Sequence, residues 1–245
     1  MDLDMYKSPA TKKNIETLVK NGNILIKPGI GSLASGMSGE GRVEEPELIL
    51  DILKNHIKKK LIFKDKTFLI TAGPTFEMID PVRFIGNFSS GKMGYELAKE
   101  ASRLGAKVHL ISGPSNEQIN DENIILKRII SADEMFDECS KVFNDIDIFI
   151  MSAAVSDYKP FKKKHNKIKK DKSEKISLEL IKNKDILKSL GSKKIKGQKI
   201  IGFSLETENE LKNATKKLKN KNLDAIILNS LNDEGAGFNL PTNKI

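Results

Sequence analysis

A glycine-bearing loop between a predicted strand and a predicted helix carries the residue types best suited to bind an anion. Residues 86–92 end in Ser-Ser-Gly-Lys, so Ser89, Ser90 and Gly91 place hydroxyl and backbone N–H groups at the start of the helix. Because the first N–H groups of a helix are unpaired and the helix dipole is positive there, this position favours a phosphate or a carboxylate. The alternative is that the serines only cap the helix.

The same loop has the spacing of a P-loop, G-x-x-x-x-G-K, but two features oppose that interpretation. Met93 follows the lysine, where a P-loop needs Ser or Thr to bind Mg²⁺, and a thioether is a poor ligand for that hard cation. The loop also begins well after the strand, whereas a P-loop follows its strand directly. A P-loop phosphotransferase or NTPase therefore remains only an alternative function.

The elements around the loop form a predicted strand–helix–strand unit. An apolar run at 68–71 ends before Gly73, and residues 91–104 show helical spacing with Gly105 where a helix commonly ends in a left-handed residue. A second apolar run at 108–111 predicts the next strand. Such crossovers place the loop at the carboxyl end of the first strand, where doubly wound sheets bind ligands.

The alternation of strands and helices continues toward the C-terminus. Patterns predict strands at 124–129, 146–151, 199–203 and 224–228, and helices at 133–143 and 208–220. We therefore expect an α/β fold with a doubly wound, mostly parallel Rossmann-like sheet and helices on both faces. A further helix is predicted at 47–60.

A series of motifs follows the predicted sheet in a fixed order. The motifs are Ile70-Thr-Ala-Gly-Pro-Thr75, Ile79-Asp-Pro-Val-Arg83-Phe-Ile-Gly-Asn87-Phe-Ser-Ser-Gly-Lys-Met-Gly94, Ser152-Ala-Ala-Val-Ser-Asp157-Tyr-Lys-Pro160, Lys167-Ile-Lys-Lys170, Leu180-Ile-Lys-Asn-Lys-Asp185-Ile-Leu187, Ile201-Gly-Phe203-Ser-Leu-Glu-Thr207 and Lys221-Asn-Leu-Asp224. Together they resemble the phosphopantothenate cysteine ligases of bacterial coenzyme A biosynthesis. The resemblance covers residues 61–245 almost continuously, which is far more specific than one glycine pattern.

The resemblance implies a reaction in two steps. The carboxylate of 4′-phosphopantothenate attacks the α-phosphate of CTP and pyrophosphate leaves. The amine of L-cysteine then displaces CMP from the acyl-cytidylate. Mg²⁺ is expected to offset the charge of the triphosphate, through ligands that the sequence does not identify. A homodimer formed through the ligase domain is also implied.

The motifs assign roles to individual residues. Asn87 is expected to hold the acyl-cytidylate and orient its carbonyl, and Lys167 to reach the triphosphate from a flexible flap; both are the expected catalytic residues. Substrate binding is expected from Arg83, Ser89, Ser90 and Gly91. Nucleotide binding is expected from Ser152, Ala153, Ala154, Asp157, Lys184, Asp185, Ile186, Leu187, Phe203, Lys217 and Lys221.

Several of these residues have a structural alternative. Asn87 is also a turn former, Asp157 also a helix cap, and Phe203, placed at the end of a strand, also a core residue. Lys217 and Lys221 share one helix face if the helix reaches that far, and two like charges there are unfavourable unless an anion binds. The bland alternative for both lysines is a solvated surface.

Residues 1–60 resemble a different enzyme, the C-terminal part of the flavin-dependent phosphopantothenoylcysteine decarboxylase. The matching stretches are Ser8-Pro-Ala-Thr11 with Asn14-Ile15, Leu33-Ala-Ser-Gly36, and Gly39-Glu-Gly-Arg42 through Glu45-Pro46. The chain has Ser35 where that family has a proton-donating Cys and Asp2 where it has Asn, and the flavin-binding half is missing. We expect neither FMN binding nor decarboxylation.

The resemblances give a domain division. Residues 1–60 are expected to be a decarboxylase remnant with a linker helix, and residues 61–245 a ligase domain. After Gly237-Phe-Asn239 and Asn243 the family pattern continues, so the ligase domain is expected to be truncated at its C-terminus. An alternative function is therefore a nucleotide-binding module without turnover.

Charge distribution argues against nucleic acid as a partner. The chain has a formal net charge of +9, and residues 159–175 hold nine Lys against Asp171 and Glu174, which accounts for +7 of it. Tyr158 and Phe161 are the only aromatic residues near that run, whereas nucleic-acid binders usually combine basic surfaces with stacking aromatics. A solvated charged loop is the simple interpretation, and a nucleotide-covering flap the sharper one.

The remaining composition excludes other classes. No apolar run approaches the ~20 residues of a membrane helix, and the N-terminus lacks an export signal, so a cytoplasmic protein is expected. Cys139, the single cysteine, excludes a disulfide framework and lies at helical spacing with apolar residues, which favours a core role. The three histidines, His56, His109 and His165, show no metal-ligand spacing.

Overall fold

The computed structural model describes residues 1–169 and 176–230, and the chain divides into two compact units, Met1–Ile62 and Phe63–Ile245. Each unit is described by itself. The expectations for Lys170, for the rest of the basic run up to residue 175 and for the motif at 237–243 lie outside the described residues. The assignment of residues 1–60 to a decarboxylase remnant remains a prediction.

The first unit contains three helices and one antiparallel strand pair. Its elements are α1 (Leu3–Lys7), α2 (Pro9–Lys20), β1 (Gly29–Ser32), β2 (Ser38–Arg42) and α3 (Pro46–Lys60). The side chain of Asp2 caps α1 and that of Ser8 caps α2. Ser35 Oγ also donates a hydrogen bond to Asp2 Oδ1 at 2.9 Å. Gly41 is the only buried residue among those whose burial is described in this unit.

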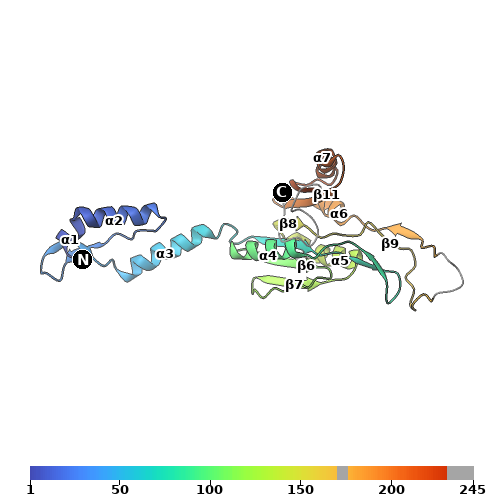
Figure 1. Cartoon of the computed structure of the whole chain (residues 1–245), viewed down its shortest axis with the longest axis horizontal. Helices are drawn as coiled ribbons and strands as arrows, with labels where there is room; N and C mark the ends of the chain where they lie inside the picture. Colours follow the sequence, from blue (N-terminus) through green and yellow to red (C-terminus); the bar gives the residue numbers. More distant parts are fainter. Residues whose placement is uncertain (170–175, 231–245) are drawn as a thin grey trace. The chain divides into compact units, whose positions relative to one another are not determined.

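The second unit is built on a parallel sheet of six strands (Figure 1). The strands are β3 (Thr67–Ala72), β6 (Lys107–Ser112), β7 (Ile124–Arg128), β8 (Ile148–Met151), β11 (Lys199–Glu206) and β12 (Ala225–Ser230). They lie in the order β12-β11-β8-β3-β6-β7, and every pair is parallel. Counted along the chain this is the Rossmann order 3-2-1-4-5-6, which reverses between β3 and β8. The predicted fold class is confirmed.

Helices cover both faces of this sheet, because its central strands are apolar on both sides. On one face α4 (Lys92–Arg103) packs Tyr95 and Ala98 against Phe68 and Ile70 of β3. On the other face lie α5 (Ala132–Val142), which a short 3₁₀ turn (Phe143–Asp145) extends, α6 (Ile186–Lys193) and α7 (Glu210–Asn220). Leu69 of β3 belongs to the core cluster on that second face. One strand therefore contributes to both halves of the core.

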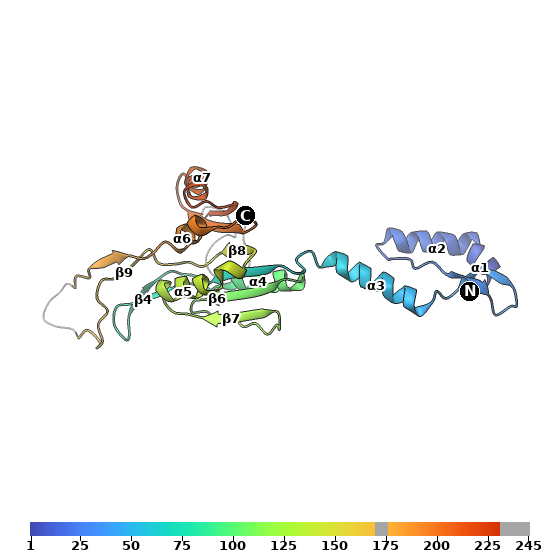
Figure 2. The ribbon, with the colours of Figure 1, turned by 180° about the vertical axis from the view of Figure 1, so that it is seen from behind.

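Two short hairpins project from the sheet and were not predicted from the sequence. One pairs β4 (Phe76–Met78) with β5 (Phe84–Gly86), and the other pairs β9 (Tyr158–Pro160) with β10 (Leu180–Lys182). Figure 2 shows β4 and β9 at the same end of the unit. Both hairpins begin in the loops that follow the central strands β3 and β8, so they belong to the carboxyl edge of the sheet.

The loop before α4 differs from its prediction in one detail. Gly91, with φ of 84°, is the N-cap residue, so neither Ser89 nor Ser90 occupies the cap position. A Cβ atom on Gly91 would lie 3.0 Å from Ser115 Oγ and 3.2 Å from the backbone nitrogen of Gly73, so the close approach of three loops requires glycine here. At the other end of α4, Gly105 has φ of 97° and follows the C-cap, as predicted.

Candidate active site

The loops after β3 and β8 meet at the point where the strand order reverses. The backbone N–H of Ala154 donates to the carbonyl of Gly73 at 2.9 Å, and that of Thr75 donates to the carbonyl of Ala154 at 3.2 Å. Thr75 is fully buried, and its hydroxyl accepts from the N–H of Ser156 at 3.0 Å. The two loops are therefore a firmly bonded platform at the position where doubly wound sheets bind ligands.

Asn87 extends this platform from the β4–β5 hairpin. It directly follows β5, is exposed, and donates from Nδ2 to the carbonyl of Ala154 at 3.0 Å. Its own carbonyl accepts from the N–H of Ser89 at 3.0 Å, so it also shapes a tight turn. The hydrogen bond to Ala154 places the side chain of Asn87 over the carboxyl end of β8, next to the start of α4.

The predicted anion-binding loop lies beside Asn87. Ser90 Oγ accepts from the N–H of Lys92 at 3.3 Å, and the carbonyl of Ser90 accepts from Ser115 Oγ at 2.5 Å. Ser90 therefore serves the first turn of α4 even though Gly91 occupies the cap position. These contacts hold the loop in place, and the binding role predicted for Ser89, Ser90 and Gly91 stays a prediction.

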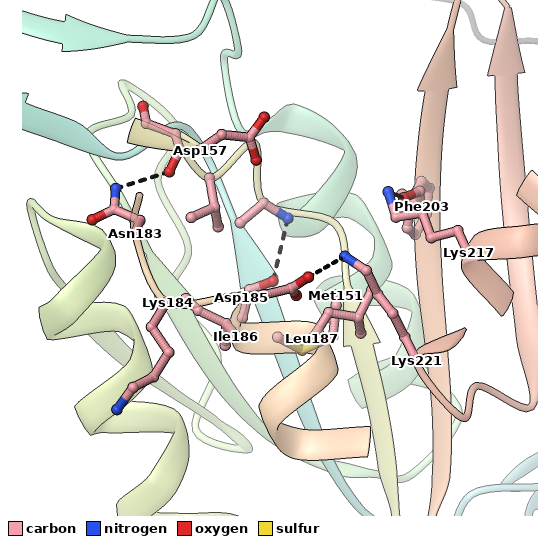
Figure 3. A pocket seen from close by; sticks show the side chains of 14 residues that line it. Met151, Asp157, Asn183, Lys184, Asp185, Ile186, Leu187, Phe203, Lys217 and Lys221 are labelled. Atoms are coloured by element: carbon pink, nitrogen blue, oxygen red, sulfur yellow. Dashed lines mark hydrogen bonds and ion pairs between the residues drawn. The ribbon is translucent and has the colours of Figure 1, made fainter. Parts of the chain in front are cut away.

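A cavity of about 180 Å³ opens next to the platform and gathers most of the predicted nucleotide-binding residues (Figure 3). Those that line it are Ala153, Asp157, Lys184, Asp185, Ile186, Leu187, Phe203, Lys217 and Lys221. Ser152 and Ala154 are part of the adjoining loop instead, and Ser152 Oγ donates to the carbonyl of Thr71 at 2.6 Å. Residues from four separate segments of the sequence thus converge because the sheet brings their strand ends together.

Two lysines make part of the cavity wall strongly cationic. Lys217 Nζ donates to the carbonyl of Phe203 at 2.7 Å, and Lys221 Nζ lies 2.8 Å from Asp185 Oδ2. Helix α7 ends at Asn220, and Lys221 is its C-cap. The side chains of Lys217 and Lys221 nevertheless both line the same cavity. Burial lowers the pKa of Lys217, and the nearby charge of Lys221 lowers it further. A bound anion would therefore offset the free-energy cost of keeping Lys217 charged in this buried position next to Lys221.

Asp185 balances part of this positive charge. It caps α6 by accepting from the N–H of Lys188 at 2.9 Å, and it forms the ion pair with Lys221. Burial opposes its ionisation, but the contacts with Lys221 and Lys188 and the charge of Lys217 outweigh burial, so the pKa of Asp185 is lowered. The Asp185 carboxylate is therefore ionised at neutral pH.

Two predicted residues differ in their placement from what the sequence suggested. Phe203 does not end its strand, because β11 continues to Glu206; Phe203 lines the cavity from within the strand and is only partly buried. Lys184 lines the cavity, but its ammonium group lies 3.9 Å from the ring centre of Phe136 on α5 and so points away from the cavity (Figure 3). For its ammonium group to contact a ligand in the cavity, the Lys184 side chain would have to leave the Phe136 ring.

Two other predicted residues lie outside the cavity. Lys167 is exposed and does not line it. Arg83 lies in the turn between β4 and β5, where its Nε donates to Asp80 Oδ2 at 3.0 Å and its Nη2 donates to the carbonyl of Ile168 at 2.8 Å. The structure therefore brings Arg83 close to the residue that follows Lys167, a connection that the sequence did not reveal.

Comparison with known proteins identifies the family. The model of the DNA/pantothenate metabolism flavoprotein C-terminal domain matches residues 63–245. The chain belongs to this family.

Two named relatives align with almost the whole of this chain. It is 45% identical over 249 aligned residues to a cysteine/cysteine sulfinic acid decarboxylase from an unknown prokaryotic organism, covering 100% of this chain and 69% of that protein. It is 42% identical to the coenzyme A biosynthesis bifunctional protein CoaBC of Borreliella burgdorferi, covering 96% of this chain and 60% of that protein. The chain thus spans 69% of the length of the first relative and 60% of the length of the second.

A solved structure confirms the fold of the family domain. The crystal structure of the C-terminal domain of coenzyme A biosynthesis bifunctional protein CoaBC superposes with a TM-score of 0.59 at 41% sequence identity, covering 69% of this chain and 78% of that chain.

Sequence reasoning missed several residues of the site. Thr71 and Asn183 line the cavity, and Asn183 Nδ2 donates to the carbonyl of Ser156 at 2.8 Å. Asp80, fully buried, organises the turn that holds Arg83. The only sequence signal for Asp80 was its position three residues before Arg83, with a proline between them. That spacing suits a turn closed by an ion pair.

The described residues contain no group of three His, Cys, Asp or Glu side chains able to hold a metal ion. Asp157 and Asp185 nevertheless supply two carboxylates to the cavity wall. That donor set fits Mg²⁺, which commonly takes one or two carboxylates and completes its shell with water and phosphate oxygens.

In the described part of the chain no helix is long and apolar enough to span a membrane.

Proposed function

We propose that this family member catalyses the CTP-dependent joining of 4′-phosphopantothenate to L-cysteine, a step of coenzyme A biosynthesis. The observation that carries the proposal is one cavity beside the strand-order reversal, which collects nine residues of the ligase motifs from the loop after β8, the start of α6, β11 and the end of α7. The matched CoaBC relatives, named for coenzyme A biosynthesis, support the pathway.

The first half-reaction requires a triphosphate to be held against its own charge. Lys217 and Lys221 are the cationic groups of the cavity, and the nucleotide phosphates would take the place of Asp185 beside Lys221. The cavity of about 180 Å³ is below the ~300–1,000 Å³ that encloses a whole small ligand. We therefore place only part of CTP inside it and the α-phosphate toward the Asn87 loop. Attack by the substrate carboxylate there releases pyrophosphate.

The second half-reaction requires an oriented acyl group. The Asn87 side chain, held by Ala154 at the edge of the platform, carries one further Nδ2 hydrogen and one carbonyl oxygen for the acyl-cytidylate. A carboxamide donates without changing its charge, which suits a mixed anhydride that already bears a phosphate. The amine of cysteine forms the amide bond, loses a proton, and CMP leaves with the electron pair of the broken acyl–oxygen bond.

Mg²⁺ fits the proposed nucleotide site. When bound it supplies charge neutralisation to the triphosphate. Asp157 and Asp185 are the carboxylates near enough to the cavity to hold it, since both line the wall.

We also propose a homodimer in the cytoplasm, for which sedimentation of the purified chain and fractionation of the source cells are the tests.

Pyrophosphate release tests the proposal directly. With CTP, Mg²⁺ and 4′-phosphopantothenate, the full chain should release pyrophosphate without cysteine present, and addition of cysteine should yield the amide product. ATP should serve less well. Binding of CTP without any release would leave the alternative of a nucleotide-binding module, and equal use of ATP would contradict the assignment to CTP.

A further inference from the structure

Asp80 is a buried carboxylate with an unusually complete set of partners. Its side chain is 0% exposed in the turn between β4 and β5. Oδ1 accepts from the N–H groups of Val82 at 2.8 Å and Arg83 at 2.9 Å. Oδ2 accepts from the Arg83 guanidinium and, 88 positions away in sequence, from the N–H of Ile168 at 3.1 Å. A buried charge without such partners would be strongly destabilising.

Arg83 completes the contact with Ile168. Its Nη2 donates to the carbonyl of Ile168 at 2.8 Å, so both backbone polar groups of that residue are fixed by one ion pair. A second anchor lies four residues earlier, where the N–H of Lys164 donates to the carbonyl of Ile79 at 2.9 Å. Residues 164–168 are thereby fastened along the turn of the β4–β5 hairpin, with Lys167 between the two anchors.

The ion pair persists over a wide pH range. Burial by itself would raise the pKa of Asp80, but the hydrogen bonds from Arg83, Val82 and Ile168 outweigh burial and hold the pKa well below its usual value. Asp80 therefore remains ionised under mildly acidic conditions, and the fastening of Ile168 does not switch off there.

The β4–β5 hairpin links Asn87 and Lys167, the two residues expected to be catalytic in the proposed reaction. Asn87 follows β5 at its base, and Ile168, the neighbour of Lys167, is held at its turn. We infer that Asp80 is a positioning residue for the proposed ligation: with Arg83 it fixes the backbone of Ile168 and so sets where Lys167 lies relative to Asn87. The inference rests on the proposed function, and it gives Arg83 a role in positioning rather than only in substrate contact.

Hydrogen exchange of the full chain tests the fastening without any assay of activity. In Asp80→Asn, the backbone amides of Ile168 and Lys164 should exchange about tenfold to a hundredfold faster than in the wild type, because Ile168 loses its charged acceptor and the segment held by the two anchors loosens. Amides of β3 should be unchanged. Asp121→Asn is the matched control, since Asp121 accepts from Ser102 Oγ and the N–H of Asn123 before β7, away from this turn.

A second pair of variants covers the case in which Asp80→Asn is poorly folded. Ile168→Pro removes the N–H that Asp80 accepts, whereas Ile168→Ala keeps it and changes only the side chain. Faster exchange of the Lys164 amide in the proline variant, with little change in the alanine variant, supports the inference. Unchanged exchange in both Asp80→Asn and Ile168→Pro overturns it.

A double-mutant cycle tests whether Asp80 acts through Lys167. Asp80→Asn should lower kcat for pyrophosphate release about tenfold or more while the KM for CTP stays within about twofold, since the Lys217 side of the cavity is untouched. In a Lys167→Ala background the same substitution should cause no further loss. Additive losses would overturn the inference. Absence of pyrophosphate release from the wild type would instead refute the ligase proposal, and the exchange measurement would still decide whether Asp80 fixes this segment.

Discussion

Lys221 and Asp185 form an ion pair inside the cavity, with Nζ 2.8 Å from Oδ2. A bound triphosphate therefore competes with Asp185 for Lys221. In the absence of Mg²⁺, we expect Asp185→Asn to raise the affinity for CTP about 3–10-fold, because Lys221 is released while an Asn can still cap α6. Calorimetric titration measures this, with the exposed Asp137→Asn on α5 as the control. Weaker binding would show that the Asp185 carboxylate itself contacts the nucleotide.

Lys217 should make CTP binding depend on pH. Burial lowers its pKa, so charged Lys217 costs folding stability below that lowered pKa, and this cost disappears as pH rises toward the ordinary 10.5. A phosphate beside it restores the pKa, so binding in the alkaline range should take up protons. Titrations in buffers of different ionisation enthalpy measure the uptake, and Lys217→Met should abolish it. Equal uptake in that variant would contradict the assignment to Lys217.

Asn87→Asp should impair the second half-reaction more than CTP binding. The substitution replaces a donor by a negative charge beside the acyl-cytidylate, and losing one oriented donor typically costs about 10²–10³ in rate. Pyrophosphate release without cysteine, compared with product formation when cysteine is present, separates the two steps. Near wild-type rates for both steps would mean that Asn87 serves only its turn with Ser89.

Tyr95→Phe should leave stability unchanged or raise it by up to about 1 kcal/mol. The Tyr95 side chain is 0% exposed, and its hydroxyl has no hydrogen-bond partner among the described residues. Removing an unpaired buried hydroxyl while keeping the ring avoids its desolvation cost. Urea unfolding measures the difference, with the exposed Tyr158→Phe as the matched control. A loss of more than 1 kcal/mol would reveal a hidden partner.

The chain should release no CO₂ from phosphopantothenoylcysteine, even with FMN added. Ser35 stands where a proton-donating thiol is expected, and its hydroxyl donates instead to Asp2 at 2.9 Å. A thiol ionises near pH 8.5, whereas an alcohol is a far weaker acid. Because a 45% identical relative is named a cysteine/cysteine sulfinic acid decarboxylase, cysteine and cysteine sulfinate belong in the same assay. Release of CO₂ from any of the three substrates would refute the expectation.

Much of the fold followed from local patterns, because its central strands are buried on both faces. The apolar run around Leu69 was specified by its pattern, and the end of α4 by the glycine that follows its C-cap, Gly105. The sequence placed the end of β11 at Phe203, whereas pairing with β12 carries the strand on through Glu206. Strand length is decided by the neighbouring strand, which a local pattern does not contain.

The site was predictable where residue type decides the chemistry and less so where long side chains choose between partners. Most nucleotide-binding candidates line the cavity because they sit at strand ends or helix starts. Lys184 turns instead to the ring of Phe136, and Arg83 to Asp80 and Ile168. Phe136 and Ile168 lie far from Lys184 and Arg83 in sequence, so a local pattern does not contain these two contacts. The strands of both hairpins are three residues long, too short for an alternating pattern to predict them.

Cys139 is a natural probe of local opening of the protein core. The thiol is 0% exposed within the core cluster beneath α5, and burial raises its pKa to about 12. It is the sole cysteine in the chain, so a thiol reagent can react at no other site. Modification therefore waits for α5 to separate from the sheet, and its rate reports how often that half of the core opens. Ligand-induced tightening of the fold can be followed in the native molecule, with no label introduced.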